Sequence, residues 1–257
     1  MTSESHRLNR MRFGRTAEQF AASTAIRRLS QVESLLQLAT PVKEDRLLDV
    51  ACGPGRLLAT VAPHVRFAVG VDLTLEMLVI ARKQRLGEGG RPLGLVLGEG
   101  ERLPFRDGAF TVVTTTLAIH HFGDPRWVVA EMTRVCRLGG RIAVSDIVAS
   151  ADDAKRALAN EIERLRDPSH AEELSSAGLE ELLTSQGLVV RGRASGSLTR
   201  ELEEWCRLAG TSPEAAARVR AMLLASQPGD LAGMAPVLAG SAVTFRHDWM
   251  TLLAVKR

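Results

Sequence analysis

Two acidic residues and a glycine-containing turn follow apolar segments in the first third of the chain. The segment DVACGPG at 49–55 follows Leu47 and Leu48, and Asp72 closes the apolar run FAVGV at 67–71. A strand that turns sharply into a helix needs glycine where φ is positive or where a ligand approaches the main chain. A carboxylate at the tip of the next strand can accept hydrogen bonds from both hydroxyls of a ribose. These residues predict a site for a nucleoside cofactor.

The spacing of the small residues argues against a dinucleotide cofactor. A dinucleotide fingerprint reads G-x-G-x-x-G/A, whereas Leu58 occupies the third small position here. The segment instead reads D-x-x-x-G-x-G. In this it resembles motif I of the class I S-adenosylmethionine-dependent methyltransferases.

Further segments resemble the motifs of that family in the same order. They are VDLTLEML (71–78), GEGERLPF (98–105), DGAFTVV (107–113), AIHHFGDP (118–125) and EMTRVCRLGGR (131–141). Together with RDPSH at 166–170, they resemble the ubiquinone/menaquinone-biosynthesis-like small-molecule methyltransferases. The resemblance implies an α/β, Rossmann-like fold with a seven-stranded, mostly parallel sheet and helices on both faces.

The resemblance also implies which residues contact S-adenosylmethionine and its product S-adenosylhomocysteine. Asp72 would hold the ribose, Met77 would lie near the adenine, and Glu99 would face the adenine amino group. An alternative role for Asp72 is to cap the helix that begins at Thr74. Ala51 and Glu99 depart from the family, which usually has Gly and Asp there. The full expected set is Asp49, Ala51, Gly53, Pro54, Gly55, Asp72, Leu73, Met77, Glu99, Gly100, Glu101, Thr116 and His121.

Methyl transfer from a sulfonium is an in-line displacement, which mainly needs the acceptor held close to the methyl group in a dry pocket. A base is needed only where the acceptor carries its proton, and histidine suits that task near neutral pH. His121 is the first candidate for a base or acceptor-orienting residue, and His170 is the second. The alternative is that both only pack and hydrogen-bond. No histidine and acid pair has metal-ligand spacing, so no metal is predicted.

Strands and helices alternate through the motif region. Strands are predicted at 46–51, 66–72, 93–98, 110–116 and 141–147, and later at 188–194 and 248–256. Such alternation indicates a parallel sheet whose ligand crevice lies at the carboxyl ends of the strands, where the motifs fall. Helices are predicted at 151–166, 171–186 and about 198–225. The last of these would form an insertion that roofs the substrate pocket.

The N-terminal region divides at residue 15. Residues 1–15 are polar and arginine-rich, and we expect them to be mobile unless something covers them. Residues 16–39 carry apolar side chains at helical spacing, which predicts either packing against the sheet or a lid. We expect one domain over 1–257, with a lid at 1–40, a cofactor-binding core at 41–150 and substrate-side elements at 151–257.

Composition narrows the partners. The 257 residues are 45% hydrophobic and 25% charged, the net charge is +3, and the basic residues are dispersed, which disfavours a nucleic-acid surface. No apolar leader or membrane-length segment stands out. The three cysteines are typical of reduced cytosolic thiols. We expect a cytoplasmic monomer or homodimer with a small-molecule acceptor.

Two other functions stay open from the sequence. A protein can retain the cofactor and catalyse a reaction without methylation, such as cyclisation. A macromolecular methyltransferase is the other, although TLAIH at 116–120 differs from the D/N-P-P-Y/F of exocyclic-amine methylases.

Overall fold

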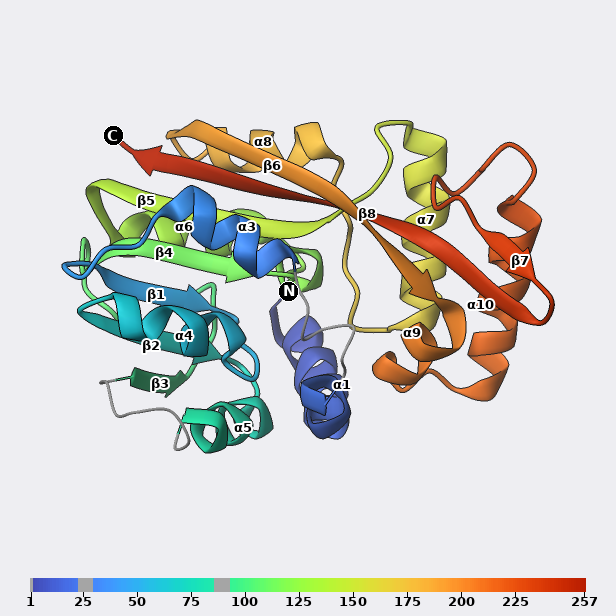
Figure 1. Cartoon of the computed structure of the whole chain (residues 1–257), viewed down its shortest axis with the longest axis horizontal. Coiled ribbons are helices and arrows are strands. Elements are labelled where there is room, and N and C mark those ends of the chain that lie inside the picture. Colours follow the sequence, from blue (N-terminus) through green and yellow to red (C-terminus); the bar gives the residue numbers. More distant parts are fainter. Residues whose placement is uncertain (1, 23–29, 86–92) are drawn as a thin grey trace.

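A twisted sheet of eight strands runs through the computed structural model, which describes residues 2–22, 30–85 and 93–257. The order is β3-β2-β1-β4-β5-β8-β6, and the short β7 pairs with β8 (Figure 1). Strands β1 to β5 are parallel, and β8 is antiparallel to β5 and β6. The strands are β1 (Arg46–Val50), β2 (Phe67–Asp72), β3 (Leu93–Leu97), β4 (Phe110–Thr116), β5 (Cys136–Val148), β6 (Leu188–Glu201), β7 (Val237–Ala239) and β8 (Ala242–Lys256). The predicted mostly parallel sheet is confirmed, and β7 is an addition to it.

Helices cover both faces of this sheet, and each face has its own apolar core. One core includes Leu35 and Leu58, and the other includes Met132 and Leu183. The helices of the first face are α3 (Ser30–Ala39), α4 (Arg56–Val61) and α5 (Leu75–Arg85), and those of the second are α6 (Pro125–Val135) and α8 (Ser176–Thr184). Short 3-10 turns lie at η1 (Ala62–His64) and η2 (Ile119–His121).

Local sequence explains how α6 begins and which face it buries. The Asp124 side chain accepts a hydrogen bond from the Arg126 amide, and Pro125 occupies the first turn, where no amide donor is needed. Buried residues then recur at helical spacing from Val128 to Val135. A cap and an apolar stripe therefore place this helix against β4 and β5.

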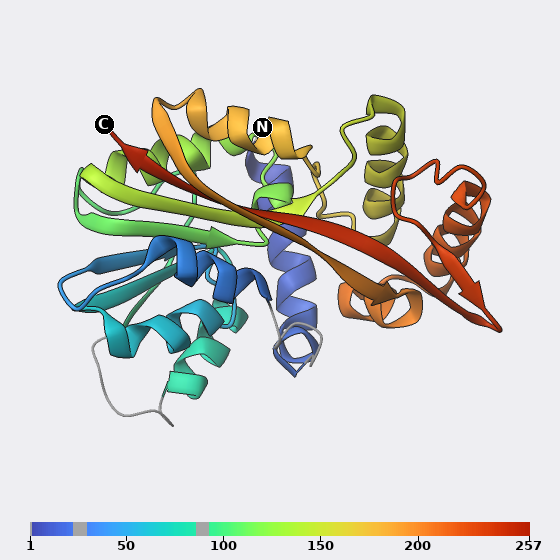
Figure 2. The ribbon, with the colours of Figure 1, turned by 45° about the horizontal axis from the view of Figure 1, so that its top comes forward.

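The two longest strands extend beyond the central sheet. In Figures 1 and 2, β6 and β8 run on as a twisted ribbon toward α7 (Asp153–Arg166), α9 (Leu202–Ala209) and α10 (Pro213–Ser226). A third apolar cluster fills this part of the molecule and includes Ile162, Trp205 and Phe245. The insertion predicted between the last two strands is therefore α9 and α10, and it packs on the extended ribbon.

The structure changes three expectations. Residues 2–15, expected to be mobile unless something covers them, are covered: they form the first part of helix α1 (Thr2–Ala22), which contacts α5 and α9. Residues 198–201 continue β6 instead of starting a helix, since each pairs with β8. The helix predicted at 171–186 begins only at α8, where Ser175 caps it. Part of the helical segment predicted at 16–39, residues 23–29, lies outside the described residues.

No helix among the described residues is both long and apolar enough to cross a membrane.

Candidate active site

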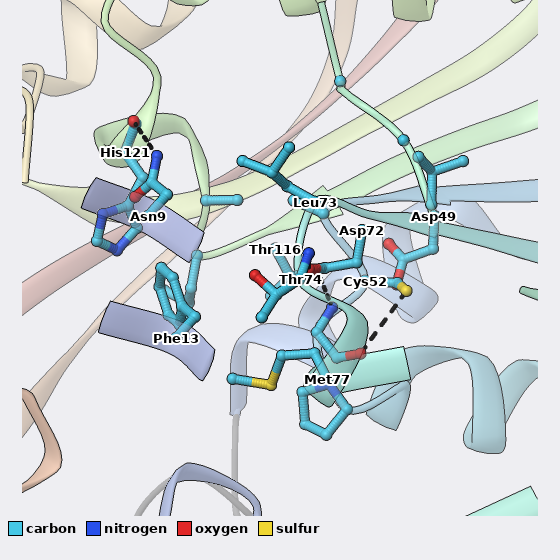
Figure 3. Close-up of a pocket in the computed structure, with 18 of the residues that line it drawn as sticks. Asn9, Phe13, Asp49, Cys52, Asp72, Leu73, Thr74, Met77, Thr116 and His121 are labelled. Atoms are coloured by element: carbon cyan, nitrogen blue, oxygen red, sulfur yellow. Dashed lines mark hydrogen bonds between the residues drawn. The ribbon is translucent and has the colours of Figure 1, made fainter. Parts of the chain in front are cut away.

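A cavity lies at the carboxyl ends of β1, β2 and β4, and α1 forms one of its walls (Figure 3). Every residue of the expected cofactor set except Gly55 lines this cavity. Gly55 acts in packing, because it has a φ of 78° and a Cβ there would lie 3.0 Å from the Cβ of Ala81. Its small size lets α4 approach α5 closely.

Asp72 is held by the main chain beside the cavity. Its Oδ2 accepts a hydrogen bond from the Gly53 amide and its Oδ1 accepts one from the Thr74 amide, both at 2.8 Å. Burial raises the pKa of Asp72, and these amide bonds oppose that rise. The carboxylate therefore caps the following turn and also faces the cavity, so the two roles considered for it are compatible.

Asp49 lies deeper, at the end of β1. Its Oδ1 accepts a 2.8 Å hydrogen bond from the Thr114 hydroxyl on the neighbouring strand β4. Burial raises the pKa of Asp49 to about 7, the Thr114 bond opposes the rise, and the charge of Asp72 adds to it. This side chain can change its protonation state near neutral pH, inside the cavity.

Two residues on the cavity wall have a backbone conformation that favours glycine. Ala51 has φ 55° and Leu117 has φ 54°. A side chain in this left-handed region costs about 1 to 2 kcal/mol. Ala51 stands where the methyltransferases that the sequence resembles usually have glycine, so this departure carries a conformational cost.

The end of β4 has an unsatisfied hydroxyl. Thr116 Oγ1 is buried and, over the described part of the chain, has no hydrogen-bond partner. Such an atom is costly unless a ligand meets it. Nearby, Gly53 has φ 53° with nothing within 4 Å of where a Cβ would stand, which leaves its backbone accessible. Both observations fit a polar ligand in the cavity, and the residues present fit S-adenosylmethionine.

Cys52 also lines the cavity, as a packing residue. A Cβ on Gly70 would lie 2.6 Å from the Cys52 sulfur, so the two strand ends are tightly packed here. Burial raises the pKa of this thiol well above its usual value. The cysteine is therefore a neutral, unreactive wall residue.

Helix α1 supplies site residues that the sequence patterns did not identify. His6 lies 3.0 Å from a Glu101 oxygen and 3.4 Å from a Glu99 oxygen. The Asn9 side-chain amide donates a hydrogen bond to the His121 carbonyl oxygen at 3.1 Å (Figure 3). The rings of Phe13 and His121 contact each other edge to face, with their centroids 4.9 Å apart. The three α1 residues share one helix face through their spacing of three and four, but two of them are polar and so gave no hydropathy signal.

A second cavity adjoins the first. Phe13, Leu117 and His121 line both cavities, so they stand at the junction. The second cavity continues between α7, α9 and the extended ribbon of β6 and β8. Besides His121, its charged and imidazole side chains are Arg12, His120, Glu163, Arg166, Glu173, Arg200, Glu201, Glu204 and His247.

The geometry of His121 suits a proton acceptor. Its Nδ1 lies 3.1 Å from the Ser169 carbonyl oxygen, which can only accept, so this nitrogen carries the proton and Nε2 keeps its lone pair. Burial, and then the charge of the neighbouring His120, lower the pKa of His121 well below its usual value. The ring is therefore neutral at the junction of the cavities.

The other two histidines of this group lie farther from the junction. His120 Nδ1 lies 2.6 Å from Asp146 Oδ1, and although burial lowers the pKa of His120, Asp146 outweighs it and the net change is upward. His170 lines neither cavity; its Nε2 lies 2.7 Å from Asn160 Oδ1, and burial lowers its pKa to about 4. The structure therefore brings His121 to the site and leaves His170 behind His120.

One group in the second cavity has metal-ligand spacing, which the sequence patterns did not predict. Over the described residues, Glu163, Glu173 and His247 offer ligand atoms within 4.8 Å of one another. Arg166 Nη2 already lies 2.8 Å from Glu163 Oε2. Burial raises the pKa of Glu163, but the charge of Arg166 is among the effects that lower it, and the net pKa lies well below the usual value. Burial and the nearby Glu163 raise the pKa of Glu173 well above its usual range, so this side chain is neutral.

The chain resembles known proteins over most of its length. Residues 48–144 match a family model described as a methyltransferase domain. A candidate methyltransferase from Bacillus halodurans, known from its crystal structure, is 28% identical in sequence and superposes with a TM-score of 0.84. The match covers 89% of this chain and 99% of the Bacillus halodurans chain. YcgJ of Bacillus subtilis, an uncharacterized methyltransferase, is 29% identical over 203 residues, which is 79% of this chain and 80% of that protein.

A demethylmenaquinone methyltransferase from Thermotoga maritima is also similar over a shorter segment. It is 33% identical over 117 residues, which is 44% of this chain and 48% of that protein. The segment matched by the family model contains the residues of the first cavity from Asp49 to His121. The chain is thus similar to a methyltransferase domain over residues 48–144, and to methyltransferase-like proteins over most of its length at 28–29% identity.

Proposed function

We propose that this chain transfers a methyl group from S-adenosylmethionine to an oxygen, nitrogen or carbon atom of a small-molecule acceptor. The observation that carries the proposal is the meeting of two cavities at His121, Phe13 and Leu117. A transfer between two bound molecules needs adjoining sites with one short path between the reacting atoms.

The first cavity is proposed to hold the cofactor. Asp72 would accept hydrogen bonds from the ribose hydroxyls, and Asp49 in its ionised form would face the ammonium group. Glu99 and Glu101, next to His6, would border the adenine. Thr116 Oγ1, which is buried without a partner among the described residues, would hydrogen-bond toward the methionine portion.

The bound cofactor supplies an electrophilic methyl group on its sulfonium. The chain supplies the position of the acceptor and a junction whose walls, Phe13 and Leu117, are apolar. Where the acceptor carries a proton, His121 Nε2 takes it up and later releases it to water. His120 and Asp146 hold each other in place behind His121. A direct role of His170 stays a prediction, and the geometry gives it no support.

Calorimetric titration with S-adenosylhomocysteine tests the cofactor site. Asp72→Asn keeps one carbonyl oxygen to cap the turn at Thr74 but loses the charge, so we expect affinity to fall at least tenfold. The matched control is Asp107→Asn, since the Asp107 side chain is 81% exposed and lies outside both cavities. Equal affinity for wild type and Asp72→Asn, or no binding by the folded wild type, would contradict the proposal.

Product analysis separates methylation from the other open functions. One of the solved structures that share the fold is a [4+2]-cyclase, with a TM-score of 0.61 and 16% identity. A methyltransferase converts the cofactor to S-adenosylhomocysteine in step with the appearance of a methylated acceptor. A cyclase leaves the cofactor unchanged, and a macromolecular enzyme transfers the methyl group to nucleic acid or protein.

Three further expectations stay predictions. They are the cytoplasmic location, the single-domain organisation with an N-terminal lid, and the monomeric or dimeric state.

A further inference from the structure

An arginine near the end of β6 lines the second cavity without an ion-pair partner. Arg200 lies opposite Phe245 in the β6–β8 pairing, on the partly buried side of a strand whose alternate residues are exposed. Its Nε is buried without a hydrogen-bond partner, and no hydrogen bond or ion pair of its side chain occurs within residues 2–22, 30–85 and 93–257. A partly buried guanidinium without a partner is unusual, because its desolvation is not compensated.

The two other arginines of the cavity are paired, which sets Arg200 apart. Arg166 contacts Glu163 Oε2 through Nε at 2.9 Å and through Nη2 at 2.8 Å. The Nε of Arg12 lies 2.9 Å from Asp167 Oδ2. Their carboxylates are thus already committed, and neither is available to Arg200.

The charges around Arg200 do not neutralise it. Burial lowers the pKa of Arg200, the charge of Arg166 lowers it further, and Glu163 and Glu204 only partly offset these effects. Glu204 is 31% exposed and lies 3.8 Å from Arg207, and Glu201 is exposed. Glu201 and Glu204 therefore line this end of the cavity with Arg200, but neither is a direct partner of its guanidinium.

Apart from Thr199, the remaining wall of the cavity is apolar. Its apolar part is formed by Phe13, Leu117, Ile147, Trp205 and Leu208. A ligand that fills this space needs an apolar body and, at the Arg200 end, a negative charge. The planar guanidinium suits a carboxylate or a phosphate, each of which it can bind through two parallel hydrogen bonds.

We infer that the methyl acceptor has an apolar body and a carboxylate or phosphate group, and that Arg200 binds this anionic group while the reacting atom lies at His121. The inference rests on the proposed function, because it assigns the second cavity to the acceptor. Arg200 is then a specificity residue in contact with the substrate, and it lies outside the cofactor cavity.

A divalent cation at Glu163, Glu173 and His247 would be a different way to bind an anion. Arg166 occupies one oxygen of Glu163 at 2.8 Å, and the neutral Glu173 adds no charge. A cation there would be repelled by Arg166 and would receive only one carboxylate charge. Direct binding by Arg200 needs no such displacement.

Three probes with one ring and different head groups test the inference. Benzoate, phenyl phosphate and benzyl alcohol are titrated into protein saturated with S-adenosylhomocysteine, first without divalent metal and then with added Mg²⁺, and binding is followed by NMR. The variants are Arg200→Gln, which removes the charge, and Arg200→Lys, which keeps it. Arg246→Gln is the matched control, because Arg246 lies in register with Thr199, is half exposed, pairs with Asp248 and lines neither cavity.

We expect at least one of the two anions to bind wild type at least about tenfold more tightly than benzyl alcohol, and the tighter anion identifies the head group. Arg200→Gln should lose this preference, Arg200→Lys should retain part of it, and Arg246→Gln should leave it unchanged. Melting curves check that each variant is folded. If Arg200→Gln does not fold, the anion preference of Arg200→Lys is compared with that of wild type instead.

Three results would overturn the assignment of Arg200. Wild type could show no preference for either anion at the highest soluble concentration. Arg200→Gln could bind the anion with an affinity within twofold of that of wild type, or anion binding could require added Mg²⁺. Affinity for S-adenosylhomocysteine should stay within twofold in every variant. Failure of wild type to bind S-adenosylhomocysteine would instead contradict the proposed function, so the two failures are distinguishable.

Discussion

Replacing Asp49 by asparagine should make the cofactor-free protein more stable, and increasingly so as pH rises. Burial raises the pKa of Asp49 from 3.8 to about 7. Between these values the unfolded chain has released the proton and the folded protein has kept it. The free energy of unfolding of wild type therefore falls as pH rises from about 4 to about 7.

The size of the effect follows from the same two values. Each pH unit in this window costs about 1.4 kcal/mol, so the full shift corresponds to about 4 kcal/mol. From pH 5 to pH 8 the remaining loss is about 2 to 3 kcal/mol. The amide introduced by Asp49→Asn does not titrate, and its oxygen can still accept the 2.8 Å hydrogen bond from Thr114. The stability difference between Asp49→Asn and wild type should therefore grow by about 2 to 3 kcal/mol over that range.

Urea unfolding of cofactor-free wild type and Asp49→Asn at pH 5, 6, 7 and 8 measures this difference. Thr114→Val and Thr114→Ser form the matched pair. The Thr114 hydroxyl lowers the pKa of Asp49, so its loss in the valine variant should move the fall in stability to higher pH, while the serine variant should resemble wild type. A difference between Asp49→Asn and wild type that stays constant from pH 5 to pH 8 would contradict a raised pKa of Asp49 in the folded protein.

Two further predictions concern the loop after β1 and the junction of the cavities. Ala51→Gly should raise the free energy of unfolding by about 1 kcal/mol, because φ 55° suits glycine. The control Ala59→Gly, in the interior of α4, should lower it by about 0.5 to 1 kcal/mol. A loss of stability in Ala51→Gly would contradict backbone strain at residue 51. His121→Gln should lower kcat by about 10²- to 10⁴-fold for an acceptor that carries a proton, and the loss should be smaller for an acceptor already ionised at the assay pH. An equal loss with both acceptors would assign His121 to positioning alone.

Short contiguous motifs were enough to predict the residues that line the first cavity. The turn at Gly53 and the acid at Asp72 each lie at the end of a parallel strand, and parallel strands end at one edge of a sheet. The predicted residues therefore meet in one cavity without any long-range information beyond the order of the strands. Gly55 differs because its packing partner, Ala81, lies on a later helix.

The N-terminal wall could not be predicted in the same way. Asn9 and His121 are 112 positions apart, and the face that α1 turns to the cavity is partly polar. Hydropathy periodicity detects a helix by the apolar face it buries against a core. A helix that turns His6 and Asn9 toward a cavity gives no such signal, so periodicity predicts no helix over residues 1–15.

Local periodicity and turns of a few residues were enough to predict the parallel sheet, its helices and the strand ends that line the first cavity. They could not predict the second cavity, whose charged and imidazole residues come from α1, η2, α7, β6, α9, β8 and, with Glu173, the segment before α8. It depends on how far β6 and β8 continue as a twisted pair, and so on a register of cross-strand contacts such as Arg200 with Phe245. Such contacts form between residues far apart in the chain and follow from packing rather than from any local pattern.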